Sequence, residues 1–240
     1  MRQRILTVLA ASVCAAATAN AQTVNQAMVW AAVFGDHRIG AKSALHWDYQ
    51  ARRADFVERW QIMLSAVGYT RDLSKEWRTT VALGAMLGYP YGTFRARTKN
   101  AELRPMIQLT GSRPLGSFTW SDRIRAEVRL LHPVGSSAPA DADWMQSVVR
   151  LRRQDKLQHR ISRDGRWYGA AATELFVNVL PERSRVGMLE QVRGQVVLGR
   201  SLTPHNRIET GYGLQYFNRR GGAELNHTLI INYRTTVPIR

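Results

Sequence analysis

The stretch from Thr119 to Leu131 reads TWSDRIRAEVRLL and alternates charged and apolar residues from position 123 onward. The two kinds occupy opposite parities: Arg123, Arg125, Glu127 and Arg129 against Ile124, Ala126, Val128 and Leu130. Successive side chains of a β-strand point to opposite faces, so this stretch predicts a strand with one ionic and one apolar face. A soluble sheet buries the apolar face, whereas a membrane-spanning barrel turns it outward and turns the charged residues into the lumen.

Segments with this period of two recur along the whole chain, separated by short turns rich in Gly, Pro, Asp and Ser. We expect eleven strands: Gln26–Phe34, Ala44–Arg53, Val57–Tyr69, Glu76–Tyr89, Ala101–Thr110, Ser117–Leu131, Trp144–Gln158, Arg166–Leu180, Val186–Gly199, Asn206–Phe217 and Ala223–Tyr233. Short links between consecutive strands favour an all-β fold, a single antiparallel up-and-down β-barrel of about 10–12 strands. Bacterial barrels usually have an even number of strands, so we also expect that one strand is missed or split.

Strand length and aromatic placement favour the membrane interpretation. Most expected strands reach the roughly 9–11 residues that a tilted membrane strand needs. Tryptophans near strand ends are typical of interfacial girdles, and six fit this pattern: Trp47, Trp60, Trp77, Trp120, Trp144 and Trp167. The longest expected loop, His132–Asp143, would face the cell exterior in such a barrel. The alternative is that these aromatic residues form the core of a soluble barrel.

The N-terminal residues 1–21 have the features of a cleaved secretory signal peptide. These features are a basic start at Arg2 and Arg4, an apolar stretch at Ile5–Ala17 and the small-residue site Ala19–Ala21. We therefore expect a mature chain of residues 22–240 that forms one β-barrel domain. Lipid attachment at Cys14 fits less well, because Val13 stands where a small residue is needed. Cleavage would remove the one cysteine of the sequence and with it any disulfide or thiolate zinc site.

The chain is strongly basic, with 34 Lys and Arg against 18 Asp and Glu and a net charge of +16. Excess Lys and Arg often indicates a nucleic-acid partner. Here the arginines alternate through the expected strands instead of clustering in a tail, so we expect internal ion pairs, contact with anionic lipid headgroups and no nucleic acid. After the signal, no apolar run approaches the roughly 18 residues of a spanning helix, so a chain that crosses a membrane must do so as a closed barrel.

Charged and amide side chains share one parity on several further strands, and we predict that they form an ion-pair network in the lumen. Its members are Glu102, Arg104, Arg123, Arg125, Glu127, Arg129, Arg150, Arg152, Glu174, Arg193 and Glu209. An Arg that faced lipid at the bilayer midplane would cost roughly 2–4 kcal/mol. One interpretation is a polar core that holds a small barrel closed, because buried charges are normally paired. The other is a basic channel or pocket that selects an anionic solute or lipid group.

The ordered series of blocks resembles a bacterial family known as domain of unknown function 2490. Residues 102–108, ELRPMIQ, are similar to its ENRPWQQ block, and residues 123–129, RIRAEVR, to its RxRLExR block. Similar short blocks follow at 174–178, 191–193, 211–212 and 226–227. The sequence departs from the family at Leu103, Met106 and Val192 and keeps the charged positions. The family is exported and barrel-like and has no established activity, so the resemblance implies an architecture and a place in the cell envelope only.

No catalytic motif is found in the sequence, and we expect a protein that is not an enzyme and holds no cofactor or metal. Acyl transfer needs a hydroxyl beside an imidazole base and a polar orienting group. The six histidines are scattered, and the nearest pair, His159 and Ser162, has an odd spacing that places the two on opposite faces of a strand. His and carboxylate residues do not cluster at ligand spacing. The Gly211–Gly213 segment lacks the rest of a nucleotide fingerprint.

We therefore expect a cell outer-membrane protein of a Gram-negative bacterium. Its partners would be outer-membrane lipid and lipopolysaccharide, with the barrel assembly machinery during insertion. One feature opposes this expectation, because such chains commonly finish on an aromatic residue, whereas here Tyr233 is followed by seven more residues. A soluble periplasmic binding barrel is the first alternative, and an outer-membrane acyl-transfer enzyme is the second.

Overall fold

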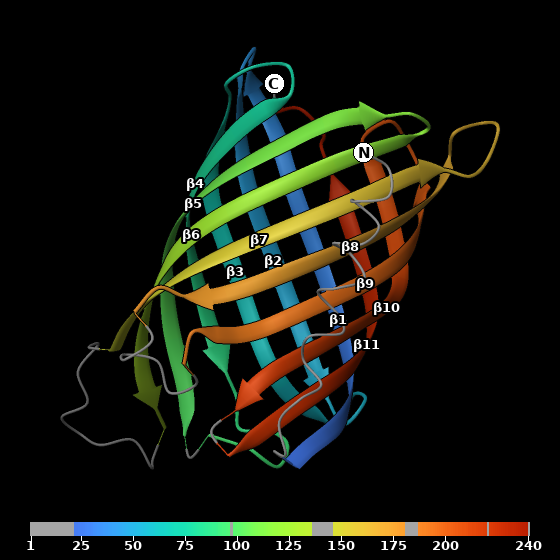
Figure 1. The fold of residues 1–240 in the computed structure, drawn as a ribbon. Coiled ribbons are helices and arrows are strands. Elements are labelled where there is room, and N and C mark those ends of the chain that lie inside the picture. The colour runs from blue at the N-terminus through green and yellow to red at the C-terminus, as the bar shows by residue number, and fades with distance from the viewer. Residues whose placement is uncertain (1–21, 97, 136–145, 181–186, 220, 240) are drawn as a thin grey trace.

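A computed structural model describes residues 22–96, 98–135, 146–180, 187–219 and 221–239. Eleven strands form one closed barrel (Figure 1). They are β1 (Gln22–Gly40), β2 (Ser43–Ala54), β3 (Arg59–Asp72), β4 (Trp77–Gly88), β5 (Lys99–Leu115), β6 (Phe118–Val134), β7 (Gln146–Arg160), β8 (Trp167–Asn178), β9 (Leu189–Ser201), β10 (Asn206–Arg219) and β11 (Gly222–Thr235). The expected signal peptide lies outside the described residues, and within them no helix is long and apolar enough to cross a membrane.

Each of the eleven expected strands overlaps one observed strand, and the expected and observed bounds differ mostly by a few residues at the strand ends. A more important difference concerns the long loop that was expected to begin at His132, after β6. This strand continues to Val134, and His132 and Pro133 pair with Ala101 and Asn100 of β5. The expected loop start at His132 is therefore wrong, because β5 is longer than predicted and gives these residues a pairing partner. Residues 136–143 of that loop lie outside the described residues.

The barrel closes through a parallel pair, β1 with β11, which run side by side in Figure 1. Their register extends from Gln22 opposite Gly222 to Gly35 opposite Thr235. All the other neighbouring strands are antiparallel. In a meander with an odd number of strands, the first and last strands run in the same direction, so closure must be parallel. The expectation of an even strand number, with one strand missed or split, is wrong.

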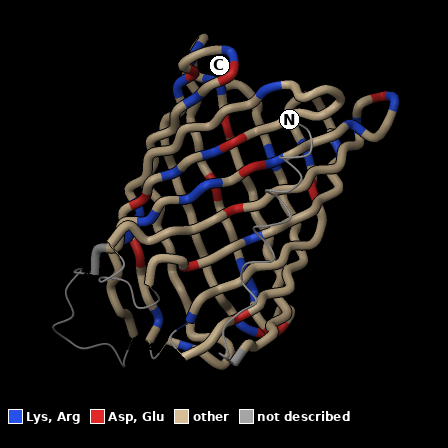
Figure 2. The backbone as a smooth tube through the Cα atoms, viewed as in Figure 1, with Lys and Arg blue, Asp and Glu red and all other residues tan. Residues whose placement is uncertain are grey.

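The strands expose apolar side chains on the outside of the barrel and turn polar ones inward. On β3 and β4, Val67, Val81 and Leu83 are 55%, 57% and 51% exposed. The inward-facing residues of these two strands include the small Ala66, Thr80, Ala82 and Gly84. Strands β5 to β9 instead carry long Arg and Glu side chains on their inner face, and Figure 2 shows charged positions along the wall as well as at its ends.

The tryptophans of the expected girdle are placed in different environments. Trp60 and Trp167 are exposed on the outside, and Trp120 is half-buried. Trp47 is also half-buried, with its indole so close to the β1 backbone that only a glycine fits at position 35. Trp77 instead lines the central cavity near the turn between β3 and β4, which corrects its assignment to the outer girdle. Trp144 lies outside the described residues.

Candidate functional site

A cavity of about 1260 Å³ occupies the lumen, and all eleven strands contribute residues to its lining. The eleven charged residues that the sequence singles out all lie on this lining. Seven of them are at least nine-tenths buried within the protein: Glu102, Arg104, Glu127, Arg150, Glu174, Arg193 and Glu209. Strand alternation thus brings together side chains that are far apart in the sequence.

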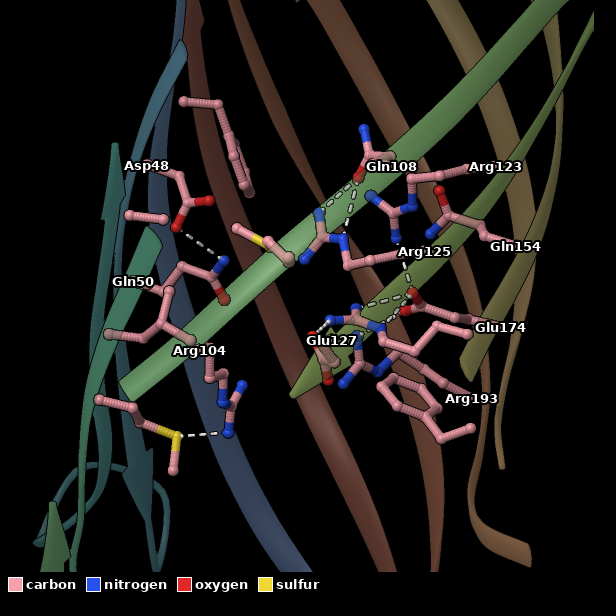
Figure 3. Close-up of a pocket in the computed structure, with 18 of the residues that line it drawn as sticks. Asp48, Gln50, Arg104, Gln108, Arg123, Arg125, Glu127, Gln154, Glu174 and Arg193 are labelled. Atoms are coloured by element: carbon pink, nitrogen blue, oxygen red, sulfur yellow. Dashed lines mark hydrogen bonds and ion pairs between the residues drawn. The ribbon is translucent and has the colours of Figure 1, made fainter. Parts of the chain in front are cut away.

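Glu174 of β8 collects three arginines from three different strands. Its carboxylate accepts hydrogen bonds from Arg123 Nη2 at 2.6 Å, Arg152 Nη2 at 2.7 Å and Arg193 Nη1 at 3.1 Å. Figure 3 shows Arg123 and Arg193 approaching this carboxylate from opposite sides. Arg123 reaches past β7 to make its contact, because β7 lies between β6 and β8 in the wall. The cluster therefore braces several strands from inside the lumen.

Glu127 of β6 continues the network toward β7. It accepts a hydrogen bond from Arg150, its direct neighbour in the register, and a longer one of 3.4 Å from Arg152 Nη1. Arg150 also donates to both carboxylate oxygens of Glu190 at 3.1 Å. Since Arg152 also binds Glu174, it links the two carboxylates. Such charge-assisted hydrogen bonds are stronger than neutral ones.

Glu102 of β5 forms the third part of the network. It accepts hydrogen bonds from Arg104 Nε at 2.5 Å and from Arg129 Nε at 2.6 Å. Arg129 also donates through Nη1 to Glu190 of β9 at 2.9 Å, past β7 and β8. Glu190 was missed by sequence reasoning because it lies at a register shift between β8 and β9, where strict alternation fails. Nine of the sequence-predicted residues and Glu190 thus form one connected network.

Glu209 does not join this network. It lies in a separate cluster, in which Lys156 Nζ at 3.4 Å and Arg234 Nε at 3.1 Å surround its carboxylate. Tyr168 also donates its phenol proton to Glu209 at 3.0 Å. The structure therefore places this residue on the same lumen wall as the others and gives it different partners.

Arg125 has no carboxylate within 4.0 Å among the described residues. Its Nε and Nη2 both donate to Gln108 Oε1, at 2.9 and 2.6 Å. Arg52 of β2 is similar, since its Nη2 donates to Gln50 Oε1 at 2.9 Å. Figure 3 shows Gln50 and Arg125 on opposite sides of the cavity. Neutral amides orient these two guanidinium groups and leave their positive charges in the lumen uncompensated.

Arg52 was missed by sequence reasoning because Arg53 follows it and the parity of the pair was ambiguous. Its guanidinium carbon lies 4.0 Å from the ring centroid of Trp30, with which it is in direct register. Arg53 points outward and stacks on Trp60 at 4.3 Å. Over the described residues, sixteen Lys and Arg and ten Asp and Glu line the cavity, which leaves an excess of six positive charges.

The connection between β4 and β5 folds into one end of the lumen. Phe94 and Arg95 of this connection line the cavity, and Tyr91 reaches toward β10 and β11. The Tyr91 hydroxyl donates to Glu224 at 2.6 Å and accepts from Arg219 Nη2 at 2.7 Å. Burial raises the pKa of the Tyr91 phenol to about 12, so it stays protonated near neutral pH. The connection therefore narrows the lumen at this end.

One hydroxyl does lie beside an imidazole on the outer wall. Tyr212 Oη is 2.6 Å from His227 Nδ1, and His227 Nε2 is 3.1 Å from Asn25 Oδ1. The three residues come from β10, β11 and β1, next to the parallel closure, and all are exposed. His159 contacts the carbonyl oxygen of Ser117 at 2.9 Å, whereas Ser162 hydrogen-bonds to Asp164. In the part of the chain that the structure describes, no cluster of three or more His, Cys, Asp or Glu could hold a metal ion.

Of three comparisons with known proteins, the one with family models agrees with the sequence resemblance. No curated protein matches this chain. Among solved structures, the chain is similar to one titled "NanC porin structure in rhombohedral crystal form", with 13% sequence identity and a TM-score of 0.45. That similarity covers 80% of this chain and 90% of the other. The family model described as protein of unknown function DUF2490 matches residues 27–226. Since this match includes most of the sequence, the chain belongs to the DUF2490 family.

Proposed function

We propose that this protein spans the outer membrane of a Gram-negative bacterium and that its basic lumen admits small anionic solutes. The observation that carries the proposal is the division of side chains between the two faces of the wall. Val81 and Ile107 are more than half exposed outside, while Glu102 and Glu174 are buried inside. Soluble monomers rarely expose large continuous apolar surfaces. An Arg on a lipid-facing wall would cost roughly 2–4 kcal/mol, so the observed orientation suits a bilayer.

The excess of positive charge in the lumen supports the preference for anions. Most of the arginines are neutralised by Glu partners, and these ion pairs hold the wall together. Arg52 and Arg125, however, bind only amide oxygens. Field strength from uncompensated charges is greater in a narrow cavity than in bulk water. A solute with a negative charge would therefore be favoured over a cation of similar size.

The outer rim supports contact with anionic lipid, including lipopolysaccharide. Arg113 stacks on Trp120 at 4.0 Å, and Arg200 stacks on Trp167 at 5.3 Å. Tryptophan favours the interfacial region of a bilayer, and an adjacent guanidinium can bind a lipid phosphate. We also propose insertion by the barrel assembly machinery, because a closed barrel of this kind must enter the membrane from an exported chain.

Three measurements test the proposal. Carbonate washing of membranes and heat-modifiable gel mobility distinguish a membrane barrel from the soluble periplasmic alternative. Planar-bilayer recording with a KCl gradient then tests passage, and we expect a reversal potential that indicates preference for chloride. Release of the protein by carbonate would contradict the membrane location. Cation preference, or no conductance at all, would contradict anion passage.

An acyl-transfer enzyme is the second candidate function, because the outer wall holds a hydroxyl, an imidazole and an amide in contact. The residues are Tyr212, His227 and Asn25. It ranks second because these three groups satisfy one another's hydrogen bonds, as polar groups on a wall commonly do. Hydrolysis of a phospholipid ester by wild type, but not by His227→Ala, would support this activity. Equal background rates for both proteins would exclude this cluster as its source.

A further inference from the structure

Two arginines and a tryptophan form a stack in the lumen, which we call the Trp30 stack (Arg52, Trp30 and Arg193). The guanidinium carbon of Arg52 lies 4.0 Å from the Trp30 ring centroid, and that of Arg193 lies 4.7 Å from it. All three residues line the cavity. Arg193 belongs to β9, which β10 and β11 separate from β1 in the wall. Its side chain therefore extends across the inner surface to reach the ring.

Each member of the Trp30 stack has a buried N–H group without an acceptor among the described residues. The atoms are Arg52 Nε, Trp30 Nε1 and Arg193 Nε. Trp30 is 8% exposed and Arg193 is 4% exposed, so both side chains are largely shielded from solvent. Buried donors are normally paired, and an unpaired one is costly. Three such donors on one stack indicate a place where an acceptor from outside the protein would be stabilised.

The charge of the Trp30 stack determines what kind of acceptor would fit. Arg193 is paired with Glu174 at 3.1 Å, whereas Arg52 has no carboxylate within 4.0 Å in the described part of the chain. Gln50 orients Arg52, and its own amide donates to Asp48 at 3.2 Å. Stacking on an indole covers the flat face of a guanidinium and leaves its N–H edge for hydrogen bonding. That edge matches the spacing of two oxygens of a carboxylate or phosphate.

We propose that the Trp30 stack is a binding site for an oxyanion, namely the carboxylate or phosphate group of a solute that enters the lumen. The proposal rests on the proposed function, because the solute must have access to the barrel interior. It goes further by assigning recognition to Arg52 and the stacked ring, and by distinguishing Arg52 from the Glu-paired arginines, among them Arg193. Those arginines hold the wall together, whereas Arg52 has charge available for a ligand.

The barrel contains a matched control for this site. Arg52 and Arg53 are adjacent on β2, and each stacks on a tryptophan, one in the lumen and one on the outside. We therefore compare Arg52→Gln with Arg53→Gln in the purified full chain, folded in a lipid-free detergent. Inorganic phosphate is titrated at constant ionic strength, and binding is followed by calorimetry and by tryptophan fluorescence. Heat-modifiable gel mobility verifies that each variant is folded.

We expect Arg52→Gln to weaken phosphate binding by about tenfold or more, since a charged hydrogen bond is lost. Arg53→Gln should bind as wild type does. Trp30→Phe should remove most of the fluorescence response and should also weaken binding. Absence of binding of both phosphate and phosphatidylglycerol by folded wild type, or equal loss of binding in both Arg variants, would overturn the proposal. If Arg52→Gln does not fold, Arg52→Lys provides the comparison, with weaker binding expected because the planar edge is lost.

A second set of measurements distinguishes a soluble oxyanion from a lipid headgroup. It also distinguishes failure of the Trp30 stack as a binding site from failure of the proposed passage of anions. Binding of free phosphate in lipid-free detergent assigns the site to a soluble ligand. Binding of phosphatidylglycerol in mixed micelles, without binding of free phosphate, assigns it to a lipid headgroup, and no response to either ligand overturns the site. Conductance with anion preference, without binding of either phosphate or phosphatidylglycerol, would overturn this site alone. Phosphate binding without conductance would keep the site and contradict passage through the barrel.

Discussion

Replacing Glu174 with glutamine removes the carboxylate that holds the largest arginine cluster of the barrel. The substitution keeps the shape of the side chain and removes one negative charge. Arg152 retains a second acceptor in Glu127 at 3.4 Å. Arg123 and Arg193, however, form their ion pairs with Glu174 alone among the residues described. Glu174→Gln therefore leaves two inward-facing guanidinium groups without a counter-charge.

The change in the free energy of unfolding can be estimated from the buried ion pairs that the substitution breaks. Breaking one buried ion pair by removing one partner typically costs about 3–5 kcal/mol. Water in a cavity of about 1260 Å³ can hydrate part of the released charge. We therefore expect Glu174→Gln to lower the free energy of unfolding by about 3 kcal/mol, at the low end of that range. Urea unfolding of the barrel in lipid vesicles, followed by tryptophan fluorescence and gel mobility, measures this change.

Glu58→Gln is the matched control, because Glu58 is exposed in the turn between β2 and β3. An exposed charge contributes little, and we expect a change of less than about 0.5 kcal/mol. If Glu174→Gln changes the free energy of unfolding by no more than this control does, the lumen network does not stabilise the barrel. That result would refute the reasoning from buried charge.

The connection between β4 and β5 and the outer face give further predictions. Tyr91→Phe removes the hydroxyl that contacts Glu224 and Arg219, so single-channel conductance should increase; unchanged conductance would show that this contact does not narrow the lumen. Because burial raises the pKa of Tyr91 from 10.0 to about 12, its protonated form stabilises the fold up to about pH 10, and this contribution is lost as the pH rises toward 12. Conductance of wild type, but not of Tyr91→Phe, should therefore increase as the pH approaches 12, where Tyr91 ionises in the folded barrel. Val81→Arg should destabilise the barrel in lipid by about 2–4 kcal/mol, and a near-zero change would argue for a soluble barrel.

The sequence predicts the wall of this barrel well because its signal is local. Alternation of Arg and Glu with Val, Ile and Leu identifies each strand and its two faces without knowledge of neighbours. Closure is different, since no local pattern of Gln22–Gly40 indicates that it pairs in parallel with Gly222–Thr235. The odd strand number therefore cannot be inferred from the local sequence.

The residues of the candidate site could be predicted from the sequence only where the strands alternate regularly. Residues on regular strands, such as Glu127 and Glu174, follow from parity. Glu190 does not, because a register shift interrupts the alternation beside it, and Arg52 does not, because an arginine follows it on the same strand. Tyr91 folds inward because it binds Arg219 on β10 and Glu224 on β11. These partners are far from Tyr91 in the sequence, so no pattern near Tyr91 predicts the contact.

Placement of probes on β4 tests most directly whether the apolar face meets lipid and the polar face meets the lumen. Single cysteines at Val81 and Leu83, which face outward, and at Thr80 and Ala82, which face inward, are labelled in a Cys14→Ser background and reconstituted in vesicles. We predict that brominated lipid quenches fluorophores at positions 81 and 83 and that a water-soluble quencher acts more strongly at 80 and 82. Equal access of the water-soluble quencher to all four positions, or lipid quenching at 80 and 82 instead, would contradict the account.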